Sequence, residues 1–171
     1  MASRKPARMY RQIRGQAYTR REYMGGVPAM RVAQFDMGNQ KGKFGVKLNL
    51  VADERCQIRD TSLEAARIAA NRYLQKRLGT MNYHVKILVY PHNILRENKQ
   101  ATGAGADRVS DGMRHSFGKA IGQAARVQSD QNLIAVWVNK TNLVTAKMGL
   151  RKAAQKLPTP CRVEIHEEQM Q

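Results

Sequence analysis

The stretch TSLEAARIAANRYLQKRLG, residues 61–79, constrains the fold most, because it has both ends and one face of an amphipathic helix. Thr61 and Glu64 have the spacing of a capping box, and Gly79 is placed to end the helix. Apolar side chains recur at helical spacing on one side, which predicts a face packed on the core. These side chains are Leu63, Ala66, Ala70, Tyr73, Leu74 and Leu78.

Short apolar runs around this helix predict the strands on which it packs. Residues 46–52 alternate apolar and polar side chains, which indicates a half-buried strand, and residues 83–91 form a strand that Pro91 closes. Residues 92–97 are expected to continue the same sheet. Further strands are predicted over 29–37, 133–139 and, at a sheet edge, 161–167.

A second amphipathic helix is predicted over residues 142–158, ending at Pro158. Its apolar face consists of Leu143, Ala146, Leu150, Ala153, Ala154 and Leu157. Strands and two helices that alternate irregularly favour an α+β sandwich. We therefore predict a mixed or antiparallel sheet with both helices packed on one face.

Positive charge is concentrated near the N-terminus. The chain carries 30 Lys and Arg against 13 Asp and Glu, a formal net charge of +17. The first 31 residues contain a single acid, Glu22, and no apolar period of a strand or helix. A segment of this composition is expected to be extended and to owe its order to a partner. We predict a basic arm over residues 1–28 and a single core domain over residues 29–171.

Such a charge excess predicts a polyanionic partner, because uncompensated cations repel one another in a compact chain. Nucleic acid is the commonest partner of this kind, and an anionic membrane surface is the second. The longest apolar run, residues 133–138, is far shorter than the ~20 residues that a membrane-spanning helix needs. We therefore predict nucleic acid, and no membrane, as the partner.

The segment ATGAGADRVSDGMRHSFGKAIGQAARV, residues 101–127, contains five glycines between basic residues. It fails as a dinucleotide-binding motif, since Arg108 stands where GxGxxG needs its third glycine. Two interpretations remain: a surface loop without a function, or a loop that approaches RNA closely while its cations meet phosphates. The second is favoured because loops beyond ~12–15 residues are usually functional or disordered. We predict that residues 98–118 project from the core.

Motifs for other chemistry are missing from the sequence. Cys56 and Cys161 form no CxxC pair, which predicts reduced thiols. The four histidines have no ligand spacing, which predicts no metal site. Ser110, Asp111 and His115 offer the residue types of a catalytic triad, but no GxSxG motif supports one. We expect no catalytic residue, no cofactor and no small-molecule substrate.

Three stretches together resemble a known family, and they cover nearly the whole chain in order. They are RKPARMYRQIRGQAYTRREYMGGVP, SLEAARIAANRYL and GAGADRVSDGMRHSFGKAIGQAARV. They are similar to the large-ribosomal-subunit proteins of the L-sixteen family, in the archaeal–eukaryotic "ten-e" form. The chain stops at CRVEIHEEQMQ, without the longer basic tail of the eukaryotic version, which favours an archaeal source. The resemblance implies an α+β sandwich with a hammerhead-like β element, in a cytoplasmic ribosome.

The resemblance also implies partners: large-subunit rRNA beside the aminoacyl-tRNA site, neighbouring ribosomal proteins, and the tRNA acceptor end. In the family, the loop that matches residues 99–112 reaches toward the peptidyl-transferase centre, and we expect it to be ordered only by its partner. Its candidate residues are Gly103, Gly105, Asp107, Arg108 and Gly112. The candidate rRNA-binding residues are Arg4, Lys5, Arg8, Arg11, Arg14, Arg20, Arg21, Arg114, Lys119 and Arg126, with Tyr10 and Tyr18 available for stacking.

Two other functions stay open at this point. A free-standing RNA-modifying enzyme with a basic docking arm would need a convergent acid–base or cofactor constellation, and none is found. A DNA-compacting protein would be expected to carry a helix-turn-helix or a ribbon reader, and neither is apparent.

Overall fold

The computed structural model describes residues 5–101, 103–105, 112–114 and 116–167. The arm contains two short 3-10 helices, η1 (Ala7–Tyr10) and η2 (Arg21–Tyr23). The helices that follow are α1 (Asp60–Leu78), η3 (Thr80–Asn82), η4 (Lys140–Asn142) and α3 (Leu143–Ala154). The strands are β1 (Asp36–Gly38), β2 (Val46–Ala52), β3 (Cys56–Arg59), β4 (Tyr83–Ile87), β5 (Asn93–Glu97), β6 (Lys119–Val127), β7 (Asn132–Val138) and β8 (Cys161–Glu167).

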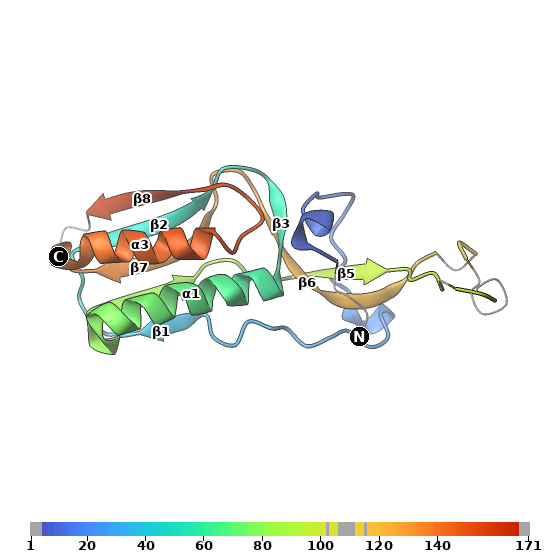
Figure 1. Cartoon of the computed structure of the whole chain (residues 1–171), viewed down its shortest axis with the longest axis horizontal. Coiled ribbons are helices and arrows are strands. Elements are labelled where there is room, and N and C mark those ends of the chain that lie inside the picture. The colour runs from blue at the N-terminus through green and yellow to red at the C-terminus, as the bar shows by residue number, and fades with distance from the viewer. Residues whose placement is uncertain (1–4, 102, 106–111, 115, 168–171) are drawn as a thin grey trace.

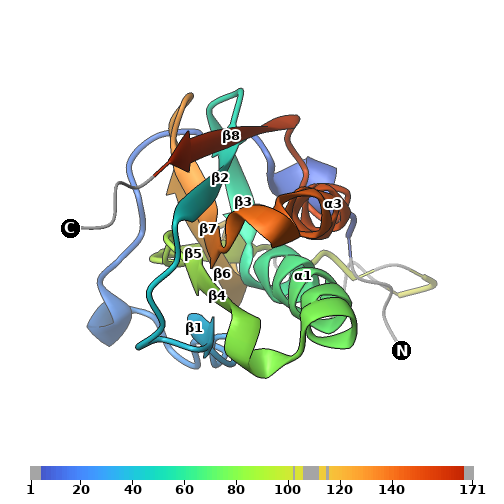
Figure 2. The same cartoon turned by 90° about the vertical axis from the view of Figure 1, so that its left-hand side faces the viewer.

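Five of these strands form an antiparallel sheet in the order β1-β4-β7-β2-β8. Both α1 and α3 cover one face of this sheet (Figure 2). Leu48, Ile134 and Val136 from the sheet are fully buried with Leu74 and Leu150 from the helices. The two helices approach closely at Gly149, where an added Cβ would lie 3.1 Å from Leu74 Cδ2. The predicted α+β class, with both helices on one face, is confirmed.

A second antiparallel sheet has the order β3-β6-β5 and lies beyond the end of the first. In Figure 1, β5 and β6 run away from the helices toward the loop of residues 98–118, and the arm lies against them. The prediction that residues 92–97 continue the first sheet was wrong, because β5 pairs with β6 instead. The sequence analysis missed β3 and β6. β3 has only four residues, and Gly122 and Gln123 interrupt the apolar pattern of β6.

The strand expected over residues 29–37 is reduced to β1. In the residues before β1, backbone N–H groups donate to acidic side chains of α1 instead of to a neighbouring strand. Arg31 N–H donates to Asp60 Oδ2 at 3.1 Å, and Ala33 N–H donates to Glu64 Oε2 at 3.2 Å. The capping box was therefore wrong as well. α1 begins at Asp60, whose Oδ1 accepts from Thr61 N–H, while Glu64 pairs with Arg67.

The other predicted elements of the first sheet are present, with shifted ends. β2, β7 and the edge strand β8 match their expected positions, but β4 ends at Ile87, well before Pro91. β2 is not half-buried as expected. Asn49 on its polar side is only 4% exposed, because β2 lies between two strands whose side chains flank it. On the helices, Tyr73 and Leu143 are only partly buried. The second helix was predicted to end at Pro158, but α3 ends at Ala154, so the partly buried Leu157 lies in the turn beyond it.

Candidate nucleic-acid interface

The N-terminal arm lies against the β3–β6–β5 sheet and is bonded to it through its backbone. Gln57 N–H of β3 donates to Arg11 O at 2.8 Å, and Ile94 N–H of β5 donates to Tyr18 O at 2.9 Å. Residues 12–17 of the arm connect these two points, one at each edge strand of the sheet. Strand edges carry unpaired donors and acceptors, and here the arm satisfies several of them.

Two buried side-chain amides of the β3–β6–β5 sheet, called the small sheet below, bind the arm on either side of residues 13–17. Gln57 Nε2 donates to Gln12 O at 2.8 Å and to Tyr10 O at 3.3 Å. Asn93 Oδ1 accepts from Tyr18 N–H at 2.9 Å, and Asn93 Nδ2 donates to Gln57 Oε1. Because buried polar groups are costly when left unpaired, this network fixes the course of the arm.

Side chains of β6 hold the arm further along. The guanidinium of Arg126 donates from its two Nη atoms to Gly15 O and Gln16 O, both at 2.8 Å. Gln123 Nε2 donates to Pro28 O at 2.9 Å, and Gln123 Oε1 accepts from Arg21 at 3.2 Å. The arm is thus attached to the sheet along most of its length.

The start of the described arm lies beside the end of β5. Lys5 Nζ is 2.7 Å from Glu97 Oε1, and Tyr10 donates to Glu97 Oε2 at 3.2 Å. The hydrogen bond to Lys5 lowers the pKa of Glu97, and the same bond raises the pKa of Lys5. Burial, with Glu97 nearby, raises the pKa of Tyr10. Glu97 thereby draws two arm side chains to the base of the glycine-rich segment.

Arg96 connects the arm with the far flank of the glycine-rich segment. Its guanidinium carbon lies 3.8 Å from the ring centroid of Tyr18 and 3.8 Å from that of Phe117. It also donates to Phe117 O at 2.9 Å. The next residue, Gly118, has φ of 77°, and an added Cβ would lie 2.7 Å from Asn98 N. Only glycine fits this close approach without strain.

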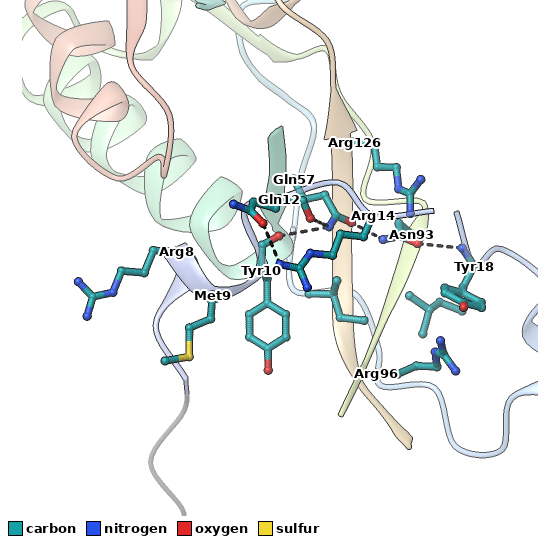
Figure 3. Close-up of a pocket in the computed structure, with 12 residues that line it drawn as sticks. Arg8, Met9, Tyr10, Gln12, Arg14, Tyr18, Gln57, Asn93, Arg96 and Arg126 are labelled. Atoms are coloured by element: carbon teal, nitrogen blue, oxygen red, sulfur yellow. Dashed lines mark hydrogen bonds between the residues drawn. The ribbon is translucent and has the colours of Figure 1, made fainter. Parts of the chain in front are cut away.

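A pocket of about 510 Å³ opens between the arm and the small sheet (Figure 3). Its lining includes Gln57, Asn93 and two apolar residues of β5. Four arginines line it, namely Arg8, Arg14, Arg96 and Arg126. No carboxylate is among its lining residues. Planar, basic groups next to tyrosines suit phosphates and bases of single-stranded RNA.

The chain is similar to known proteins over nearly its whole length. The family described as "Ribosomal protein L16p/L10e" matches residues 13–164. The chain belongs to this family. A protein of Methanocella arvoryzae named "Large ribosomal subunit protein uL16" is 60% identical over 163 residues, 95% of each chain. Proteins of the same name from Methanoculleus marisnigri and Archaeoglobus fulgidus are 58% and 51% identical, over 94% and 95% of this chain and 94% and 93% of theirs.

Membership in the L16p/L10e family confirms the resemblance seen in the sequence. None of these three relatives is named as an enzyme. Within the described ranges, no helix has the length and apolar character to cross a membrane. The same ranges contain no group of three His, Cys, Asp or Glu side chains able to hold a metal ion.

The structure brings part of the predicted RNA-binding set together. Arg8, Arg14 and Arg126 line the pocket, whereas Arg11 is paired with Glu54 and Lys5 with Glu97. Further exposed candidates lie along the arm and near the start of β6: Arg20, Arg21, Arg114 and Lys119. Arg4 lies outside the described residues.

For the loop candidates, Gly103, Gly105 and Gly112 have positive φ values of 127°, 81° and 56°, a backbone conformation that favours glycine. Asp107 and Arg108 lie outside the described residues, as does much of the 99–112 segment.

The sequence analysis did not identify the uncharged polar residues that line the pocket. Gln57 and Asn93 belong to strands that were not predicted or were assigned to the other sheet. A usable signal was present, since each amide begins or interrupts a short run of apolar side chains that the fold buries. Arg96 was treated only as a flank of the loop, although it contacts two aromatic rings.

Proposed function

We propose that this protein is a structural constituent of the large ribosomal subunit and binds large-subunit rRNA through its arm and its small sheet. The observation that carries the proposal is the pocket with four arginines and no carboxylate among its lining residues. Uncompensated cations on one face suit a phosphate backbone. The name of the relatives, "Large ribosomal subunit protein uL16", places those proteins in the same assembly.

The proposed organisation is a basic arm over residues 1–28, a core over 29–171 and a projecting loop over 98–118. The arm and the start of β6 supply the rRNA contacts. The first sheet and its helices supply the rigid support, and surfaces away from the arm are available to neighbouring ribosomal proteins. The proposed rRNA contacts are Arg4, Lys5, Arg8, Arg11, Arg14, Arg20, Arg21, Arg114, Lys119 and Arg126.

The projecting loop is proposed to support tRNA positioning at the aminoacyl-tRNA site. Its base is held by Arg96, Glu97 and Gly118, which fixes where the loop leaves the core. Gly103, Gly105, Asp107, Arg108 and Gly112 are the residues proposed to approach tRNA or the rRNA around it. Subunits that carry a deletion of residues 101–110 should assemble and bind rRNA normally but place tRNA poorly. Full translational activity of such subunits would contradict the role of the loop.

Removal of the arm tests the rRNA contacts. Deleting residues 1–25 removes Arg4, Lys5, Arg8, Arg11, Arg14, Arg20 and Arg21. Each lost phosphate contact should lower the salt dependence of RNA binding by about 0.7–0.9 in the slope of log K against log salt. The experiment compares the salt dependence of binding to large-subunit rRNA for the full and the shortened chain. An unchanged slope in a folded shortened chain would refute the proposed contacts.

Co-sedimentation separates this proposal from a free-standing RNA-modifying enzyme. A structural constituent remains with large subunits in high salt, because many contacts hold it at once. An enzyme that docks through its arm dissociates under the same conditions, because exposed ionic contacts are screened. Full release from large subunits in high salt would therefore reject the structural role.

A further inference from the structure

A second pocket, of about 530 Å³, lies next to the arginine-lined one. It is lined by the aromatic side chains Tyr18, Tyr23 and Phe117, together with Met24, Arg20 and arm residues 16, 17 and 19. Tyr18 lines both pockets, so the two pockets are adjacent. The first pocket therefore supplies four arginines and the second supplies three aromatic side chains, and Tyr18 belongs to both.

Three of the four arginines of the first pocket donate hydrogen bonds to neutral groups. Arg14 donates to Gln12 Oε1 at 3.0 Å, Arg96 to Phe117 O, and Arg126 to two backbone carbonyls. None of these three is paired with a carboxylate among the described residues. Arg126 Nε is buried and has no acceptor within the described part of the chain. The side chains are thus positioned, and their charge is available to an anion.

The aromatic side of the site is exposed and partly fixed. Tyr23 is 74% exposed, and Phe117 is 57% exposed. The rings of Tyr18 and Phe117 meet edge to face at 6.2 Å between centroids, and Arg96 lies over both. A flat aromatic ligand can stack here at a small entropic cost, because Arg96 and the backbone hydrogen bonds of Tyr18 already restrict the motion of the Tyr18 side chain.

We infer that the two pockets together bind one unstacked nucleotide of single-stranded or looped RNA. Its phosphate lies among Arg14, Arg96 and Arg126, and its base lies against Tyr18 and Tyr23. A base inside a duplex is stacked on its neighbours and cannot enter an aromatic pocket, so the ligand is an extruded nucleotide. The inference rests on the proposed rRNA binding and makes one site within it specific.

Nucleotide fragments test both halves of the site by NMR titration of the full-length protein. Adenosine 5′-monophosphate should shift the ring signals of Tyr18, Tyr23 and Phe117 and the guanidinium signals of Arg96 and Arg126. Because Arg96 lies over Tyr18 and Phe117, the two halves are distinguished at Arg126 and Tyr23. Inorganic phosphate should shift the guanidinium signals of Arg126 and leave the ring signals of Tyr23 unchanged, and adenosine should do the reverse. If the monophosphate produces only the shifts of phosphate, or if a polyglutamate peptide competes as well as RNA, the inference is wrong.

Substitutions measure the contribution of the aromatic pocket to binding of a short single-stranded oligoadenylate. Removal of one aromatic side chain on which a base stacks lowers the affinity about 5- to 150-fold. Y18L and Y23L should each lose an amount in this range and keep the salt dependence of the parent. Y23L removes a mostly exposed ring, so it provides a test even if Y18L unfolds.

Y90L is the matched control, because Tyr90 is also exposed at 52% but stacks on Phe35 and lines neither pocket. Equal affinities of Y23L, Y90L and the parent would overturn the inference. Binding to large-subunit rRNA is measured on the same samples. If rRNA still binds to the parent while nucleotide fragments give no ring shifts, the pocket fails but the proposed function stands. If the parent binds no rRNA, the proposed function fails first.

Discussion

Replacing Asn93 with alanine should release the arm locally, because this side chain joins the arm to the small sheet. Asn93 is 3% exposed and accepts from Tyr18 N–H at 2.9 Å while donating to Gln57 Oε1. Alanine leaves the donor of Tyr18 and the acceptor of Gln57 without their partner. Each buried polar group that loses its partner costs about 1–3 kcal/mol. Since water can reach the site when the arm lifts, we expect a total of about 1–3 kcal/mol, not the sum.

Amide hydrogen exchange of the folded protein measures this effect where it arises. In N93A, the amides of Tyr18 and Ile94 should exchange about 5- to 150-fold faster, the equivalent of that loss in local stability. Amides of β2 and β7 should keep their protection, because the first sheet does not contact Asn93 through any hydrogen bond described. N132A is the matched control, since Asn132 is exposed. If Tyr18 exchanges equally fast in N93A, N132A and the parent, Asn93 does not hold the arm.

Three further predictions concern the core, the loop base and the thiols. L74A should lower the free energy of unfolding by about 2–5 kcal/mol in chemical denaturation, whereas I68A, at a side chain 42% exposed, should change it little; similar losses would refute the assigned helix face. G118A should lower the melting temperature, because Gly118 has a positive φ and an added Cβ would lie 2.7 Å from Asn98 N. G122A should lower it far less, because an added Cβ there has nothing within 4 Å; equal melting temperatures of the two variants would refute the close approach. Burial raises the pKa of Cys161 to about 11 and also raises the pKa of Cys56, so both thiols should alkylate slowly at pH 8 unless the chain is unfolded. The folded-state pKa of Cys161 exceeds the unfolded value of about 8.5, so the neutral thiol contributes fully to the free energy of unfolding below pH 8.5. This contribution is lost as the pH rises toward 11. Rapid alkylation of the folded chain at pH 8 would contradict the raised pKa values.

The first sheet and its helices were predictable because their residues follow simple periods. Apolar side chains repeat at helical spacing in α1 and α3, and β7 is a continuous apolar run, so local pattern and tertiary packing agree. The errors occurred where a distant segment supplies a hydrogen-bond partner. Asp60 and Glu64 accept from the backbone of residues 31 and 33, and no local rule reveals such a contact.

The small sheet was not predictable from period, because its strands are short or carry glycine and amides. β6 buries Gln123 next to small side chains, and β3 and β5 bury Gln57 and Asn93. These amides are stable inside only because the arm supplies carbonyl and amide partners. The charge of the candidate interface could therefore be read from the sequence, but its pocket depends on pairings between residues 45 to 95 positions apart.

A density map of a large ribosomal subunit that contains this protein tests the central claim most directly. The account predicts that the arm and the β3–β6–β5 sheet face rRNA, with phosphates beside Arg14, Arg96 and Arg126. It also predicts one extruded base against Tyr18. A map in which this face is turned to solvent, or in which rRNA contacts only the α1 and α3 side, would contradict the account.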